Sequence, residues 1–220
     1  MGCWIDIDTP LGPIRGWRAE PSAPSHGAVV VIQEIFGVNA HIRHVTERFA
    51  AAGFVALAPA LFDPIERGVE LDYDDAGVAR GRDLAAALGF DRGVELVDAA
   101  ADALQDEGLR TGAVGFCWGG TLALLANTRL GLPAASYYGS RSVPFLDEPL
   151  RAPMLFHFGE RDSLIPAEHV AAHRASHPGA TIHVYPAGHG FNCEMRGDFD
   201  PASAERAWQR TSDFFRESLR

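Results

Sequence analysis

Short apolar runs alternate with helix-like segments along the chain, and this alternation restricts the fold more than any other feature. Residues 28–33 read Ala-Val-Val-Val-Ile-Gln, and residues 54–58 and 113–116 are apolar in the same way. A strand that is apolar at every position is typical of a sheet buried on both faces. Segments with helical spacing separate these runs, so the sequence predicts an α/β fold, with a mostly parallel central sheet flanked by helices.

The remaining segments extend the same pattern. Residues 4–8 and 14–18 alternate apolar and polar side chains around the turn Thr9-Pro10-Leu11-Gly12, which predicts an N-terminal β-hairpin. We expect further strands at residues 134–138, 154–158 and 181–185, and helices at residues 40–52, 76–88, 93–105, 118–128, 166–176 and 201–219. No repeat or linker interrupts them, so we predict that residues 1–220 form a single domain, a common size for α/β domains.

Charge and composition exclude several classes of protein. The chain has 220 residues, a formal net charge of −10 and 19 basic residues, all of them Arg. Without Lys it cannot form a Schiff base, and it lacks the phosphate-binding Lys of P-loop NTPases and protein kinases. A protein with a negative net charge and dispersed Arg residues binds nucleic acid or an anionic membrane poorly, because both carry negative charge. We therefore expect no nucleic acid and no membrane among its partners.

The sequence shows no signal for export or membrane insertion. It begins Met-Gly-Cys-Trp-Ile-Asp, with an early acid and no basic segment ahead of an apolar one, unlike a signal peptide. The longest apolar runs are too short to cross a bilayer. Cys3, Cys117 and Cys193 are widely spaced and odd in number, which is no disulfide framework. We predict a cytoplasmic protein with free thiols.

The segment Gly115-Phe116-Cys117-Trp118-Gly119-Gly120 follows a predicted strand and opens a predicted helix. This is the pattern of a nucleophile elbow with Cys in place of the usual Ser. The strained turn at a nucleophile elbow needs small residues two positions before and after the nucleophile. The helix N-terminus favours a thiolate, and the N–H of Trp118 would point at a developing oxyanion. The alternative is a buried structural Cys with glycines for close packing.

Two further residues decide between these interpretations. Asp162 follows the predicted strand at residues 154–158, and His189 follows the one at residues 181–185. The chain order is nucleophile, acid and then His, each near the carboxyl end of a strand, which is the order in α/β-hydrolases. Asp162 could instead cap a helix and His189 could be a plain turn residue. Three matches in the right order favour a catalytic group.

With these motifs in place, the sequence resembles the dienelactone hydrolase family of α/β-hydrolases, the carboxymethylenebutenolidases. The resemblance covers nearly the whole chain. The segments that carry it are Gln33-Glu34-Ile35-Phe36-Gly37-Val38-Asn39, the Cys117 elbow, Tyr137-Tyr138-Gly139, Asp162 and Gly188-His189-Gly190-Phe191. It implies an α/β-hydrolase fold and a carboxylic ester hydrolase that cleaves a lactone or small ester.

The resemblance also implies roles for particular residues. It assigns a catalytic triad of Cys117, His189 and Asp162, and a second oxyanion donor at the N–H of Ile35. It implies that Glu34 pairs with the thiol in the resting state and controls its ionisation. A carboxylate beside a thiol disfavours the thiolate by charge repulsion, and a protonated thiol is protected from oxidation.

Substrate recognition is less well defined. The family's prototype substrate carries a carboxylate bound by Arg, so an anionic ester or lactone is expected here. Arg196 is a candidate, although it follows His189 by a longer interval than the family pattern, and Cys193 stands where that pattern has Arg. Arg80 and Arg82 are both candidates for a second Arg. Phe36, Tyr137 and Phe191 flank catalytic positions and are expected to line an apolar pocket, or else to pack at its rim.

Other features predict little chemistry. His169, His173 and His177 recur every four residues, but no thiol or carboxylate completes a metal site, so we interpret them as a solvated helix face. We expect no metal, no cofactor, and a monomer or homodimer. Two other functions stay open: a general carboxylesterase or thioesterase on the same scaffold, and a non-catalytic ligand-binding or redox-sensing module.

Overall fold

A computed structural model describes residues 2–220, and the chain folds into two compact units. Unit 1 holds Met1–Gly112 with Leu219–Arg220, and unit 2 holds Ala113–Ser218. We describe each unit by itself, and the prediction of a single domain stays a prediction.

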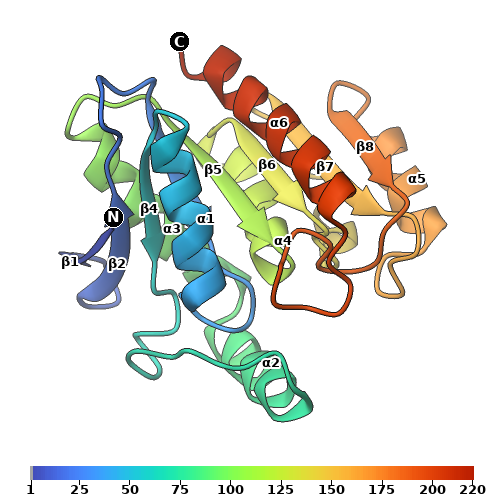
Figure 1. Cartoon of the computed structure of the whole chain (residues 1–220), viewed down its shortest axis with the longest axis horizontal. Helices are drawn as coiled ribbons and strands as arrows, with labels where there is room; N and C mark the ends of the chain where they lie inside the picture. Colours follow the sequence, from blue (N-terminus) through green and yellow to red (C-terminus); the bar gives the residue numbers. More distant parts are fainter. Residues whose placement is uncertain (1) are drawn as a thin grey trace. The chain divides into compact units, whose positions relative to one another are not determined.

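Unit 1 contains a sheet in which the predicted hairpin forms the outer part. Its strands are β1 (Cys3–Ile7), β2 (Ile14–Ala19), β3 (Ala28–Ile32) and β4 (Val55–Pro59), and its helices are α1 (Ala40–Ala51), α2 (Asp75–Leu88) and α3 (Phe90–Gln105). β1 pairs antiparallel with β2, β2 pairs antiparallel with β4, and β4 pairs parallel with β3. Every residue of β3 and β4 is buried, as their apolar sequences predicted. Helices α1 and α3 lie on opposite faces of this sheet (Figure 1).

Unit 2 is built on parallel strands. They are β5 (Thr111–Phe116), β6 (Ala134–Tyr137), β7 (Met154–Gly159) and β8 (Thr181–Tyr185), and each pairs parallel with the next. The helices are α4 (Trp118–Leu125), α5 (Ala167–Ser176) and α6 (Pro201–Ser218), with a short 3-10 turn at Val143–Phe145. In Figure 1, α6 crosses one face of this sheet while α4 lies behind it. The prediction of an α/β fold with mostly parallel strands and an N-terminal hairpin is confirmed.

The helix predicted at residues 118–128 ends differently from the prediction. After α4, residues Ala126–Leu130 form a π-helical turn, closed by Gly131 at φ 76°. The buried amide of Asn127 explains the change, because its Nδ2 donates to the carbonyl oxygens of Leu132, Ala152 and Pro153 at 3.0 to 3.1 Å. These carbonyls belong to segments that follow later in the chain. The helical pattern of residues 118–128 alone therefore did not predict the π-helical turn.

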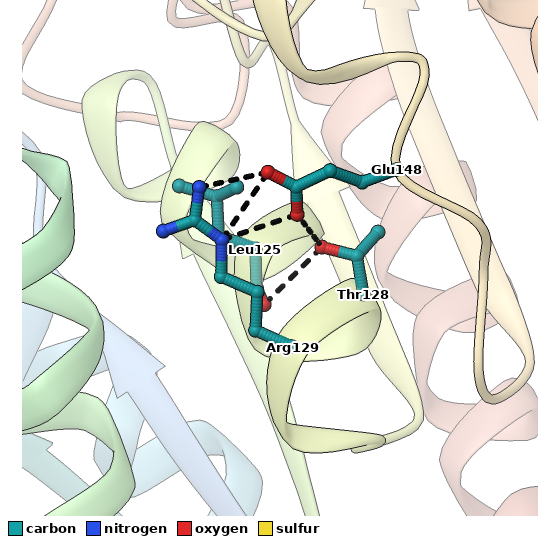
Figure 2. A network of polar contacts seen from close by, with 4 residues as sticks. All are labelled: Leu125, Thr128, Arg129 and Glu148. Carbon is teal, nitrogen blue, oxygen red and sulfur yellow. Dashed lines mark hydrogen bonds and ion pairs between the residues drawn. The ribbon is translucent and has the colours of Figure 1, made fainter.

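The same turn binds the loop after β6, as Figure 2 shows. The Arg129 guanidinium donates to Glu148 Oε1 at 2.7 Å, and the Thr128 hydroxyl donates to Glu148 Oε2 at 2.7 Å. The hydrogen bond from Arg129 lowers the pKa of Glu148 below its ordinary value. Because both side chains are about a quarter to a third exposed, the ion pair contributes on the order of 1 kcal/mol or less.

Two histidines at the C-terminal end of α5 show that the interpretation of a solvated helix face was wrong. His173 and His177 are buried, with 1% and 4% exposure, so they do not form a solvated face. The His173 ring packs edge-on against Phe156 and Phe158, and the His177 ring stacks on Phe156. Burial lowers the pKa of both histidines, so they stay neutral and serve as half-apolar core residues.

Among the described helices, none combines the length and the apolar character that crossing a membrane requires.

Candidate active site

Cys117 stands at a sharp turn between β5 and α4. Its φ of 54° and ψ of −116° are strained for a residue with a side chain. Gly115 allows this turn, because a Cβ there would collide with the carbonyl of Gly119, two residues after Cys117. The Cys117 N–H donates to the carbonyl of Tyr137 at 3.0 Å, which ties the turn to β6. The local geometry is the sharp strand-to-helix turn that the glycines predicted.

The structure brings Cys117, His189 and Asp162 into one hydrogen-bonded chain. His189 Nε2 lies 3.2 Å from Cys117 Sγ, and His189 Nδ1 donates to Asp162 Oδ2 at 2.8 Å. The other carboxylate oxygen of Asp162 accepts the N–H of Leu164 at 2.8 Å, which fixes the acid in the loop after β7. Cys117, His189 and Asp162 are 9%, 5% and 5% exposed, so little solvent screens their charges.

His189 is the residue of this group whose pKa is strongly shifted. Burial alone lowers its pKa, but the charge of the neighbouring Cys117 sulfur and the hydrogen bond to Asp162 outweigh burial and raise the pKa to about 10. The arrangement therefore favours an imidazolium at His189, next to the Cys117 sulfur. The stability that this charge contributes is fully present below the ordinary histidine pKa and is lost as the pH rises through about 10.

Trp118 supplies the first amide of α4, next to the nucleophile. The N–H groups in the first turn of a helix have no acceptor within the helix, so they can donate to an anion. Trp118 is buried, and the amide of Gly120 is already bonded to the Cys117 carbonyl at 2.9 Å. Trp118 therefore stands at the N-terminus of α4, and its role as an oxyanion donor stays a prediction.

Aromatic side chains pack around the group in unit 2. Tyr137 and Phe191, both predicted to line an apolar pocket or to pack at its rim, are 1% and 0% exposed, so their side chains are buried among their neighbours. Sequence reasoning missed Tyr138, whose ring lies edge-on to His189 with centroids 5.1 Å apart. Its φ of 41° is unusual, and the signal that could have found it is the Tyr-Tyr-Gly sequence directly after a strand.

Arg196 lies beside the histidine, despite its distance along the chain. A Cβ on Gly190 would come within 2.7 Å of Arg196 Nε, so this side chain packs directly on the residue after His189. Three successive turns coil the loop, with amide-to-carbonyl bonds from Cys193 to Gly190, Arg196 to Cys193 and Phe199 to Arg196. Cys193 is buried with a free thiol.

In unit 1, Glu34 is fully buried at the carboxyl end of β3. The Tyr73 hydroxyl donates to Glu34 Oε2 at 2.9 Å, and Asn39 Nδ2 donates to the Tyr73 oxygen at 3.1 Å. The Tyr73 ring also packs on Phe36, with centroids 4.4 Å apart. Sequence reasoning missed Tyr73, because it lies in a long acidic loop without a recognisable motif.

The other predicted residues of unit 1 lie along α2. Arg80 and Arg82 are both exposed, and Arg80 forms an ion pair with Glu66. Gly81, between them, allows α2 to approach the residue after Glu34, because a Cβ there would collide with the carbonyl of Ile35. The backbone of Ile35 therefore packs against α2 at Gly81.

The comparisons with known proteins agree with this geometry. The model of the dienelactone hydrolase family matches residues 14–219. A Synechocystis protein provisionally named a carboxymethylenebutenolidase is 33% identical over 98% of this chain and 99% of its own length. An Escherichia coli K12 relative with the same provisional name is 35% identical over 86% of this chain and 76% of its own. A crystal structure from Klebsiella pneumoniae, provisionally titled a dienelactone hydrolase, has a TM-score of 0.86 at 28% identity and covers 98% of both chains.

The mostly parallel sheet flanked by helices, with a strained strand-to-helix turn after β5, has the fold of the α/β-hydrolase class. Within that class, the chain belongs to the dienelactone hydrolase family. It is a hydrolase of the dienelactone hydrolase type, and a small ester or lactone fits that family as substrate.

The raised pKa of His189 can be tested directly. In the Cys117→Ala variant, we expect the pKa of His189 to fall from about 10 by about one unit or more, because the largest raising charge is removed. The measurement is an NMR titration of the imidazole Cε1–H signals, with His189 assigned by its loss in His189→Gln. Cys3→Ala, which removes an exposed thiol, is the control. An unchanged pKa in Cys117→Ala would show that the sulfur is not the partner of His189.

Proposed function

We propose that the protein hydrolyses a lactone or small ester by forming a thioester on Cys117. The observation that carries this proposal is the hydrogen-bonded chain from Asp162 through His189 to the sulfur, with contacts of 2.8 and 3.2 Å. Family membership supports the same reaction class. The raised pKa of His189 means that the base holds its proton at neutral pH, so an imidazolium is in place to stabilise the Cys117 thiolate when it forms.

The reaction follows from these groups. The Cys117 thiolate attacks the carbonyl carbon, and the carbonyl electron pair moves to oxygen, where the Trp118 and Ile35 amides donate to it. Collapse breaks the bond to the leaving oxygen, which departs as an enolate or takes the proton of the His189 imidazolium. A water molecule then attacks the thioester, losing its proton to His189 or to the released enolate, and the thiolate leaves. Asp162 orients His189 throughout.

We extend the proposal to Glu34, on the family resemblance and on its surroundings in unit 1. Glu34 is completely buried and receives the Tyr73 hydroxyl, so its carboxylate is held in one orientation. We propose that this carboxylate limits thiolate formation until substrate binds, which protects Cys117 from oxidation. Such a thiol suits a reducing cytoplasm, which is where we propose the protein acts.

The substrate proposal is an anionic ester or lactone whose carboxylate is bound by Arg. Arg196 is the leading candidate, because it packs on Gly190 beside His189 and can bind a carboxylate bidentately. Arg80 and Arg82 on α2 are further candidates. Since the formal net charge of the chain is −10, a local Arg is needed to offset the repulsion of an anionic substrate.

The first test concerns the nucleophile. We expect Cys117→Ala to reduce hydrolysis of p-nitrophenyl acetate and of a dienelactone by about a thousandfold or more, since the proposed acyl intermediate forms on the Cys117 sulfur. Acyl-enzyme should be visible by mass spectrometry in the native protein after rapid acid quench. Cys3→Ala is the control. Undiminished turnover by Cys117→Ala would disprove the thioester mechanism, and reversible oxidation without any hydrolysis would favour a redox-sensing module.

A second test addresses Glu34. We expect Glu34→Gln to be inactivated by hydrogen peroxide about three to ten times faster than the native protein, because the repulsive charge is gone. Glu70→Gln removes an exposed carboxylate from the same unit and serves as the control. Equal inactivation rates in Glu34→Gln and the native protein would exclude the protective role and leave the hydrolase proposal intact.

The third test separates anionic from neutral substrates. We expect Arg196→Met to raise the KM for an anionic lactone about tenfold, the loss expected for one charge-assisted contact, with little change for a neutral ester. Arg80→Met and Arg82→Met show which residue supplies the second contact, and Arg216→Met, at the end of α6, is a control. Equal losses on both substrates would assign Arg196 a structural role.

A further inference from the structure

We propose that a chain of polar side chains in unit 2, which runs from an exposed Arg into the core, positions both the nucleophile and its base. The chain consists of Arg210, Tyr185, His157, Thr211 and Tyr137, and none of these residues belongs to the Cys–His–Asp group. This inference rests on the proposed function, because it assigns positioning residues to the same site.

The chain runs from the surface of α6 to the end of β6. Arg210 Nη1 donates to the Tyr185 oxygen at 3.0 Å, and that hydroxyl lies 2.8 Å from His157 Nδ1. His157 Nε2 lies 2.9 Å from Thr211 Oγ1, which is in turn 2.7 Å from the Tyr137 hydroxyl oxygen. Four consecutive hydrogen bonds thus connect β6, β7, β8 and α6.

Arg210 favours one direction for the protons in this chain. Arg210 can only donate, so the Tyr185 oxygen accepts there, and we assign its hydroxyl hydrogen to His157 Nδ1. In this assignment His157 is the Nε2–H tautomer and donates to Thr211. Complete burial, with His183 and Arg210 nearby, holds the pKa of His157 well below its ordinary value, so the ring stays neutral and keeps both roles.

The inner end of the chain supports Cys117. Tyr137 accepts the Cys117 N–H through its backbone carbonyl at 3.0 Å, and its ring packs on Phe116 with centroids 4.8 Å apart. The carbonyl is also close to the first turn of α4, because a Cβ on Gly120 would lie 2.7 Å from it. A shift of Tyr137 would therefore move the strained turn that carries the sulfur.

The same chain supports His189 through Phe191. The Phe191 ring, two residues after His189, packs on Tyr185 with centroids 5.1 Å apart and on Tyr137 at 6.2 Å. The hydrogen-bonded chain therefore fixes the hydroxyl ends of Tyr185 and Tyr137. The rings of the same two tyrosines contact Phe191, in the loop that carries His189. Since Cys117 and His189 are 72 positions apart in sequence, this common support defines their separation.

A fully bonded polar chain in a core is costly to build and specifies one arrangement rather than many. Apolar residues of similar volume would fill the same space with comparable stability, but they would not fix the positions of two hydroxyls. The chain therefore offers positional accuracy, which a thiolate and imidazolium 3.2 Å apart require.

The decisive variant is Thr211→Val, which keeps the side-chain shape and removes the hydroxyl that joins His157 to Tyr137. We expect kcat for p-nitrophenyl acetate, per titrated Cys117, to fall about tenfold, with KM changed less than about twofold. The rate of Cys117 alkylation by iodoacetamide should fall in parallel. Thr211→Ser restores the hydroxyl and should recover kcat to within about twofold of the native value.

The matched control is Ser212→Ala, which removes the next hydroxyl along α6. Ser212 Oγ is buried and has no hydrogen-bond partner among residues 2–220, so its loss should leave kcat and alkylation unchanged. A native kcat in Thr211→Val, no recovery in Thr211→Ser, or an equal loss in Ser212→Ala would overturn the inference. If the native protein shows no Cys117-dependent hydrolysis, the proposed function fails, and the alkylation rates alone decide the positioning role.

A second variant covers the case in which Thr211→Val does not fold. Arg210 is exposed, so Arg210→Met leaves the buried core intact while removing the donor that sets the direction of the Tyr185 proton. We expect a smaller loss of kcat, about threefold, with the melting temperature within a few degrees of the native value. Unchanged kcat and alkylation rates in Arg210→Met would contradict the proposed proton order.

Discussion

The left-handed backbone at Cys117 is the constraint on which the rest of the site depends. A side chain at φ 54° costs on the order of 1 to 3 kcal/mol and persists only where its surroundings over-determine it. The surroundings do so through glycine at 115, where a Cβ would collide with the chain at Gly119, and through the bond from the Cys117 N–H to Tyr137. Relaxation of this turn would carry the sulfur away from His189. The contact between the Cys117 sulfur and the imidazole would then be lost.

Burial and charge act together at this position. Burial by itself opposes a charged His189, yet the same exclusion of water strengthens the attraction of the imidazolium to the Cys117 sulfur and to Asp162. The second effect is larger, so His189 is protonated at neutral pH although its ring is almost completely buried. An open site would hold these charges weakly, and a closed site without Asp162 would favour the neutral forms.

Sequence alone predicted those features that depend on local pattern. Apolar runs and apolar–polar alternation identified the strands of residues 2–220, and Gly-x-Cys-x-Gly after a strand identified the turn at Cys117, because each is set by residues a few positions apart. It did not predict the burial of His173 and His177 or the π-helical turn at Ala126–Leu130. Those depend on which distant segment packs on them: Phe156 on β7 in one case, and the carbonyls of Ala152 and Pro153 in the other.

Arg196 shows why counting positions is a poor guide to what can reach a site. Its place in the sequence, beyond Cys193, made its nearness to His189 doubtful, since an extended loop would carry it far away. Three successive turns, each closed by an amide-to-carbonyl bond, instead fold the loop back on itself. The Arg196 side chain then packs on Gly190, where any larger residue would displace it. The glycine after the histidine therefore serves two purposes: it takes φ 81° at the turn, and it leaves room for the one cation that the loop brings next to His189.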